Sequence, residues 1–145
     1  MNGTVLAVNI SPKRELPKKN VHTAEITNLG LKGDSHSGNW DKQVSLLSIK
    51  SIHKLMKNPD KLNYGDLFEN LTIDGIELHN RPIGTKIKIN ETILEIVQIG
   101  KPKEQFSHEE YYEKRAMVEE GIFAKVIQPG TVSVGDKIEI LSSNL

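Results

Sequence analysis

The sequence contains no cysteine in its 145 residues. This absence excludes disulfide bonds, thiolate zinc sites, iron–sulfur clusters and any cysteine nucleophile. A chain of this length can still bury enough apolar surface to fold around one core without such cross-links. The lack of cysteine is compatible with a cytoplasmic protein.

Long apolar runs and net charge are also missing. No stretch approaches the ~20 apolar residues that span a bilayer, and residues 1–10 lack the charged start and the length of a signal peptide. Lys plus Arg and Asp plus Glu number 19 each, so charge gives no reason to expect a nucleic acid or a membrane as partner. Without repeats or long linkers, residues 1–145 predict a single, soluble, cytoplasmic domain.

Short apolar stretches separated by turn signals predict a mainly β protein. One helix should follow the N-cap Ser48 and end at Asn58–Pro59, and a second should run over 108–119 from a capping box at Ser107. The segment 11–20, with two Pro and four Lys or Arg (Lys13, Arg14, Lys18 and Lys19), predicts an exposed loop, and a contact surface for an anion is the alternative. Strands are expected over 5–10, 22–29, 43–47, 86–89, 92–99, 123–127 and 137–141, with turns at 74–75, 129–130 and 135–136. Two or three short helices inserted among so many strands favour a closed or partly closed β-barrel over a doubly wound sheet.

Polar residues are concentrated in residues 30–48, where Asp34 and His36 stand two positions apart. In an extended segment both side chains would point to the same face. Such a pair could hold a metal, an oxyanion or a proton in transit. The other histidines show no ligand spacing, so a metal site made by protein side chains alone is not expected. A binding role and a structural role for His36 both stay open.

Two further polar pairs adjoin apolar residues. Lys42 and Gln43 precede a predicted strand, where the lysine could offer a positive charge to an anion and a buried glutamine would need partners for both ends of its amide. Glu69 and Asn70 follow an apolar pair, and together could bind the edge of a heterocycle. Asn70 could equally serve only to satisfy loop backbone groups.

Several segments, taken in order, resemble the MOSC domain, the C-terminal domain of molybdenum cofactor sulfurases, which also occurs in small free-standing proteins. The resemblance extends from about residue 4 to residue 141. It implies a MOSC-type β-barrel that handles the molybdenum cofactor, a pterin with a dithiolene and a phosphate. The matching segments are 30–38, 42–47, 65–72, 75–76, 82–84, 97–100, 121–124 and 134–136.

Two positions depart from the family pattern. A cysteine, the expected persulfide carrier, commonly follows the Gln-x-Gly segment, whereas Lys103 stands roughly there in this chain. An ammonium group cannot hold a persulfide, so this chain alone cannot act as the sulfur carrier. The residue before Gln43 is often arginine in the family, and Lys42 supplies a point charge in place of a two-pronged fork.

The resemblance implies a module that binds or delivers the cofactor, with Lys42, Lys103 and Lys101 facing its phosphate. Contacts to the pterin or to metal oxo groups would come from Asp34, His36, Gln43, Glu69 and Asn70. Implied partners are a molybdoenzyme or a cofactor-maturation protein, and a separate cysteine desulfurase. Two alternatives stay open: a cysteine-independent sulfurtransferase-like enzyme in which His36 shuttles protons and Asp34 orients it, and a non-catalytic interaction protein.

Overall fold

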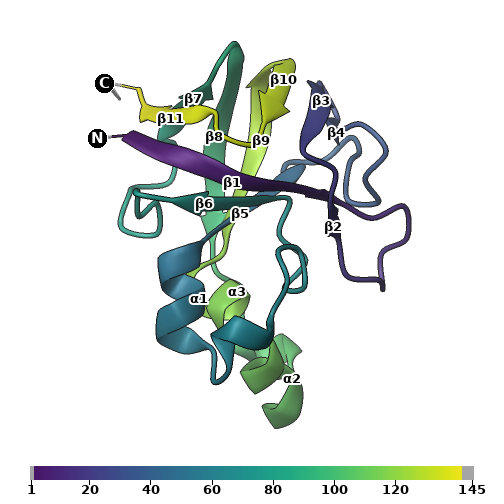
Figure 1. Cartoon of the computed structure of the whole chain (residues 1–145), viewed down its shortest axis with the longest axis vertical. Helices are drawn as coiled ribbons and strands as arrows, with labels where there is room; N and C mark the ends of the chain where they lie inside the picture. The colour runs from purple at the N-terminus through teal and green to yellow at the C-terminus, as the bar shows by residue number, and fades with distance from the viewer. Residues whose placement is uncertain (1, 142–145) are drawn as a thin grey trace.

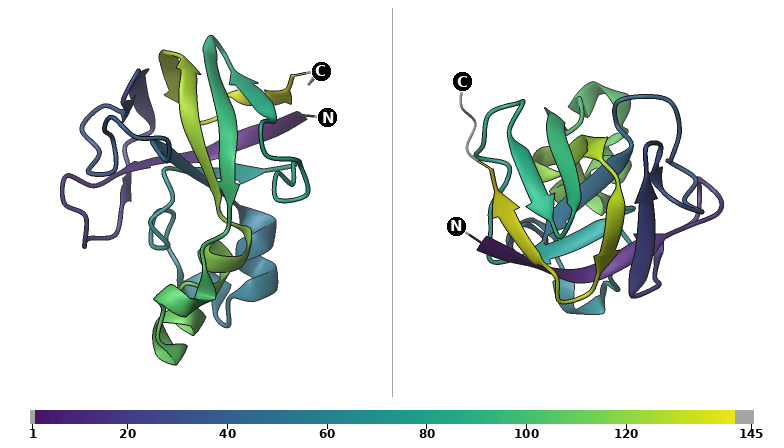
Figure 2. Two further views of the ribbon diagram at one scale, coloured as in Figure 1. Left: turned by 180° about the vertical axis from the view of Figure 1, so that it is seen from behind. Right: turned by 90° about the horizontal axis from the view of Figure 1, so that it is seen from above.

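The computed structural model describes residues 2–141 and shows a closed seven-stranded β-barrel with short helices gathered at one end (Figures 1 and 2). The strands follow one another around the barrel as β11 (Lys137–Ile140), β7 (Lys86–Ile89), β8 (Thr92–Ile99), β9 (Ile122–Gln128), β5 (Val44–Ser48), β6 (Leu71–Asp74) and β1 (Asn2–Ile10). Antiparallel pairing of β1 with β11 closes the ring. The prediction of a β-barrel is confirmed.

Strand burial follows from the sequence pattern. In β7 the two lysines are exposed and Ile87 and Ile89 are buried, which is the alternation of a strand with one face on the core. In β5 every residue is buried, because its inner face joins the barrel core and its outer face is covered by helices. Leu46 belongs to the barrel cluster, and Leu47 packs with Ile52 and Met117 in a second cluster outside it.

The helices confirm the predicted caps but not every predicted length. Helix α1 (Ile49–Leu55) begins at Ser48, whose Oγ accepts from the Lys50 N–H at 3.1 Å. The predicted helix over 108–119 is divided into α2 (His108–Glu113) and α3 (Arg115–Glu120). Its division has a packing reason: α3 buries three residues against the barrel, whereas α2 buries none and projects into solvent. Two 3-10 turns, η1 (Pro59–Lys61) and η2 (Lys103–Gln105), complete the set.

Three expected strand features are wrong in detail. The strand expected over 22–29 is shorter, β3 (Thr23–Thr27), because the chain turns and pairs back as β4 (Gly30–Leu31). The turn expected at 129–130 leads directly into a missed strand, β10 (Gly130–Ser133), and β10, β3 and β4 form a small separate sheet. The strand expected over 5–10 is longer, β1 (Asn2–Ile10), and it pairs with β6, which in turn pairs in parallel with β5.

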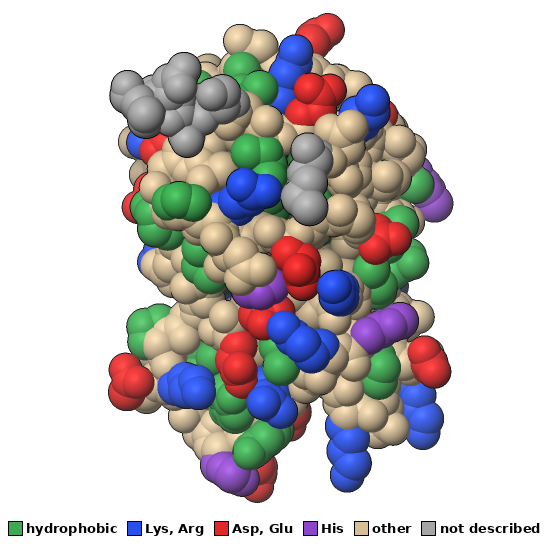
Figure 3. Space-filling model, turned by 90° about the vertical axis from the view of Figure 1, so that its left-hand side faces the viewer, with side chains coloured by type: hydrophobic (Ala, Val, Ile, Leu, Met, Phe, Trp, Pro, Cys, Tyr) green, Lys and Arg blue, Asp and Glu red, His purple; other side chains and the backbone are tan. Residues whose placement is uncertain are grey.

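The surface shown in Figure 3 carries both signs of charge. Lysine, arginine and acidic side chains are interspersed over this face, with no extended area of a single sign. One local ion pair of this kind joins Lys54 on α1 to Glu120 on α3 at 2.6 Å. No helix within residues 2–141 is both long enough and apolar enough to cross a bilayer.

Candidate functional site

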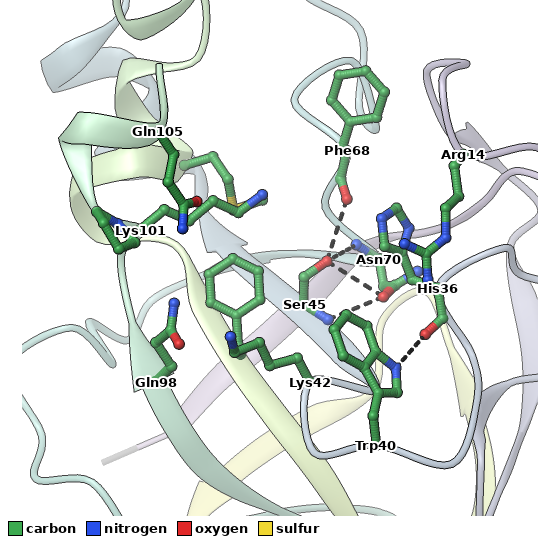
Figure 4. A pocket seen from close by; sticks show the side chains of 13 residues that line it. Arg14, His36, Trp40, Lys42, Ser45, Phe68, Asn70, Gln98, Lys101 and Gln105 are labelled. Carbon is green, nitrogen blue, oxygen red and sulfur yellow. Dashed lines mark hydrogen bonds between the residues drawn. The ribbon is translucent and has the colours of Figure 1, made fainter.

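A cavity of about 310 Å³ lies where β5 begins and β8 ends, at the helical end of the barrel (Figure 4). Loops after β1 and β4, the segment before β6 and the segment after β8 all contribute to its wall. Long-range pairing therefore assembles the site from distant parts of the chain. Its lining residues are Arg14, His36, Trp40, Lys42, Ser45, Phe68, Asn70, Gln98, Lys101, Pro102, Gln105, Met117 and Phe123.

Strand pairing fixes the floor of the cavity. The register of β8 against β9 shifts between Ile96 and Gln98, and this irregularity sets Gln98 opposite Phe123. On the neighbouring strand β5, where Ser45 is the register partner of Phe123, the Ser45 N–H donates to Asn70 Oδ1 at 2.9 Å, and the Asn70 N–H donates to Ser45 Oγ at 3.0 Å. These reciprocal bonds hold two polar side chains in one orientation.

The cavity has a positive character. Three cationic side chains line it, from Arg14, Lys42 and Lys101, and none of the lining residues that the structure describes is an Asp or Glu. Burial lowers the pKa of Lys101, and the charges of Lys114 and Lys42 lower it further. An anion bound here would relieve that repulsion.

Beneath the cavity lies a buried ion pair that the sequence analysis missed. Lys18, in the segment expected to be an exposed loop, is 2% exposed, and its Nζ lies 2.7 Å from Asp34 Oδ1. Burial by itself raises the pKa of Asp34, but hydrogen bonds from Lys18, the Ser11 N–H and Asn70 outweigh it and leave the pKa below its usual value. The carboxylate is therefore charged at neutral pH.

The His36 imidazole lies closer to Lys18 than to Asp34, the residue that would orient it in the sulfurtransferase-like alternative. Lys18 Nζ lies 3.0 Å from His36 Nδ1, whereas the nearest carboxylate oxygen of Asp34 is 4.0 Å from that nitrogen. The segment is not extended, as a shared face for the two side chains would require, but forms a turn in which Asp34 Oδ2 accepts the His36 N–H at 3.1 Å. Burial, with the charge of Lys18, lowers the pKa of His36 to about 4.

The structure brings together part of the predicted site. His36, Lys42, Asn70 and Lys101 line the cavity, and Asp34 lies below it in contact with Lys18. The others lie elsewhere, as follows. Gln43 bonds only to backbone, donating to the carbonyls of Asn28 and Gly38 and accepting from the Val126 N–H. Lys103 is exposed in η2, with its Nζ 5.2 Å from the centre of the Tyr111 ring.

Trp40 and Phe68 line the cavity but were not predicted, and Arg14 joins them from the segment for which an anion contact was the alternative to an exposed loop. The Arg14 guanidinium lies 5.7 Å from the Trp40 ring centre, and the Trp40 indole N–H donates to the His36 carbonyl at 2.8 Å. Phe68 has a positive φ of 69°, which is rare for a bulky residue and is often found at functional sites. The Arg and Trp are too far apart in sequence for any local pattern to have joined them.

Glu69 is not among the described lining residues of the cavity and is almost fully buried. Its Oε2 accepts from Thr72 Oγ1 at 2.8 Å, while Oε1 is without a hydrogen-bond partner, as is Oδ1 of neighbouring Asn9. The Asn9 amide donates to the Glu69 carbonyl at 3.2 Å. Burial raises the pKa of Glu69, so folding makes the neutral acid, which has an O–H to donate, easier to form than it is in the unfolded chain.

The raised pKa gives Glu69 a pH-dependent effect on stability. The acid form is favoured in the folded state, so its contribution is complete below about pH 4.3, the usual value for an unfolded glutamate, and is lost as pH rises toward the folded-state pKa. Replacing Glu69 by glutamine should therefore reduce the fall in unfolding free energy above pH 4.3, by up to about 1.4 kcal/mol per pH unit. Urea unfolding of both proteins between pH 4.5 and 7.5 measures this, and parallel pH profiles would contradict it.

Comparison with known proteins identifies the family. The MOSC domain model matches residues 33–139, more than half of the chain, and the chain belongs to this family, which is related to the C-terminal domain of molybdenum cofactor sulfurases. A search of curated protein sequences found no match.

Solved structures share the fold. The YuaD protein of Bacillus subtilis superposes with a TM-score of 0.78 at 17% identity, covering 99% of this chain and 98% of that one. YiiM of Escherichia coli gives 0.70 at 20% identity, covering 99% and 71%. YiiM of Geobacillus stearothermophilus gives 0.68 at 12% identity, covering 97% and 75%. At such low identities these similarities establish the barrel alone.

Proposed function

We infer that the chain binds a molybdenum cofactor of the pterin type in the cavity and delivers it without forming a covalent sulfur adduct of its own. The observation that carries this proposal is the lining: three cations, side-chain amides and aromatic faces, with no acidic side chain among the described lining residues. A phosphate and a dithiolene are negatively charged, and a pterin is flat and rich in hydrogen-bonding groups. The residues present therefore fit the group.

The cationic and aromatic residues lie in different parts of the cavity. Arg14 lies on the same side of the cavity as His36, and Lys101 lies on the other side with Gln98 and Gln105 (Figure 4), where the charge of Lys42 also acts on it. Phe68 and Trp40 offer apolar surface on which a heterocycle can stack. When bound, the cofactor would supply the metal and the dithiolene sulfurs, since the chain has no thiol. The acceptor would be a molybdoenzyme or a maturation protein, and any added sulfur would come from a separate desulfurase.

The direct test is the ligand content of protein purified anaerobically from its native host. After oxidation, pterin fluorescence and metal mass spectrometry should show near-stoichiometric pterin. Pterin without metal would place the protein before metal insertion. Absence of both, in a host shown to make the cofactor, would overturn the proposal in favour of an interaction protein.

Inverting one charge in the cavity should remove the ligand. We expect Lys42→Glu to co-purify with at least about tenfold less pterin than the wild-type protein, because it replaces attraction by repulsion at short range in a partly enclosed site. Lys88→Glu is the matched control, since Lys88 is exposed on β7, outside the cavity lining. Equal pterin content in both variants would exclude an anion-binding role for Lys42.

A further inference from the structure

The contact between Lys18 and His36 determines where the imidazole proton lies. An ammonium group has three donors and no acceptor. Because Lys18 Nζ is 3.0 Å from His36 Nδ1, that nitrogen must present its lone pair. In a neutral imidazole the single N–H is then on Nε2.

The surroundings make this arrangement rigid. Lys18 cannot turn to solvent, because its side chain is 1% exposed and its ammonium is paired with Asp34. The His36 backbone is held on both sides: its N–H donates to Asp34 Oδ2, and its carbonyl accepts from the Trp40 indole at 2.8 Å. The ring lies beside Arg14 and Asn70 at the cavity wall (Figure 4). With Nδ1 directed at the buried lysine, Nε2 is on the part of the ring turned away from it.

We propose that His36 is a fixed neutral hydrogen-bond donor, that its Nε2–H binds an oxyanion of the cavity ligand, and that buried Lys18 sets this tautomer. The proposal deepens the proposed function by naming the group bound beside Arg14, and it rests on that function for the identity of the ligand. The tautomer is a property of the chain alone.

This assignment removes two other roles from His36. With Nδ1 engaged by Lys18 and hydrogen on Nε2, the ring has no lone pair left to coordinate a metal or to accept a proton. The low pKa of His36 agrees, since burial and the charges of Lys18, Arg14 and Lys101 all oppose a second proton, and only Asp34 favours it. The ring therefore keeps one protonation state from about pH 5.5 to 8.

Nitrogen-15 NMR tests the tautomer directly. Histidine-labelled full-length protein contains five histidines, and the His36 signals are assigned by their loss in His36→Gln. We expect a protonated Nε2 and an unprotonated Nδ1 with shifts constant from pH 5.5 to 8. In Lys18→Met the two tautomers should mix. An Nδ1–H tautomer or an imidazolium in the wild-type protein would overturn the proposal even if that variant does not fold.

Binding of simple oxyanions tests the donor role. Trp40 is the single tryptophan and lines the cavity, so its fluorescence reports titrations with inorganic phosphate and with molybdate. His36→Gln, which retains an N–H donor, should bind less than threefold more weakly than wild type, and His36→Leu at least tenfold more weakly. Equal binding by all three proteins would overturn the donor role.

The two anions separate the possible sources of the oxyanion. A response to phosphate alone indicates the phosphate end of a ligand, and a response to molybdate alone indicates metal oxo groups; either supports the proposal. If the wild-type protein binds neither anion at millimolar concentration, the oxyanion role is overturned. The pterin content of the protein after anaerobic purification tests the proposed function independently of these anion titrations.

Discussion

Replacing Asp34 by asparagine is expected to lower the free energy of unfolding by about 3–5 kcal/mol, because it leaves the buried Lys18 ammonium without a counter-charge. Asparagine keeps the size and one acceptor oxygen of the side chain, so the decrease in unfolding free energy reports the effect of removing the charge. The carboxylate also accepts from the Ser11 N–H at 3.0 Å and from the His36 N–H, and both bonds weaken when the acceptor is neutral. Urea-induced unfolding, followed by circular dichroism, measures the effect.

The second member of the pair provides the control. Lys18→Met alone should be strongly destabilising, because it leaves the Asp34 carboxylate buried without its partner. The double variant Lys18→Met with Asp34→Asn removes both charges. It should be more stable than the sum of the two single decreases in unfolding free energy predicts. Simple additivity of the two effects would show that the ion pair is not coupled and would contradict the prediction.

Gly65→Ala is expected to destabilise the protein by about 2–5 kcal/mol. Gly65 has a φ of +92°, and a Cβ there would lie 2.2 Å from the carbonyl oxygen of Lys18. The Lys18 N–H also donates to the Gly65 carbonyl at 3.0 Å. The two backbone segments that place Lys18 under the cavity would be forced apart. Denaturant unfolding gives the free energy, and the fluorescence of Trp40 in the native state reports the accompanying change at the site.

Gly84→Ala separates backbone strain from steric clash. Gly84 has a similar φ of +96°, but a Cβ there would meet no atom within 4 Å. It should cost only the strain of a positive φ, about 1–2 kcal/mol. If Gly84→Ala and Gly65→Ala prove equally destabilising, the close approach to Lys18 contributes nothing.

Features set by neighbouring residues could be predicted from the sequence. Ser48 and Ser107 form their caps with groups two or three positions away, and the strands with clear alternation, such as β7 and β8, were predicted with their observed bounds. The sequence analysis missed the division between α2 and α3, because the residues of both halves favour a helix. Only burial of one half against the barrel separates them.

Features set by distant residues could not be predicted. Lys18 and Arg14 lie in a segment whose composition indicates an exposed loop. Yet the contact with Asp34 buries Lys18, and the contact with Trp40 places Arg14 at the cavity. Gln43 shows the reverse case. Its position beside Lys42 suggested a ligand contact, but its side-chain amide instead connects the backbone carbonyls of Asn28 and Gly38 to the Val126 N–H of β9.

The role of Lys103 stays a prediction. It occupies the approximate place of the family's cysteine, yet the structure sets its ammonium over Tyr111, outside the described lining of the cavity. Lys101, two positions earlier, is the lysine of this segment that reaches the cavity. In an irregular loop, a shift of two positions decides whether Lys101 or Lys103 reaches the cavity. No periodic sequence pattern predicts the course of such a loop.

The pairing of β1 with β11 also constrains how the chain is made. Asn2 lies opposite Glu139 and Thr4 opposite Lys137, so the seam joins two strands that are separated by more than 130 positions of the described chain, and it can form only after β11 has been synthesised. Until residues 137–140 emerge, β1 and β7 each present an open edge, which is the kind of surface that promotes aggregation during synthesis. A premature stop before residue 137 would therefore yield an unsealed sheet, even though every residue lining the cavity would already be present.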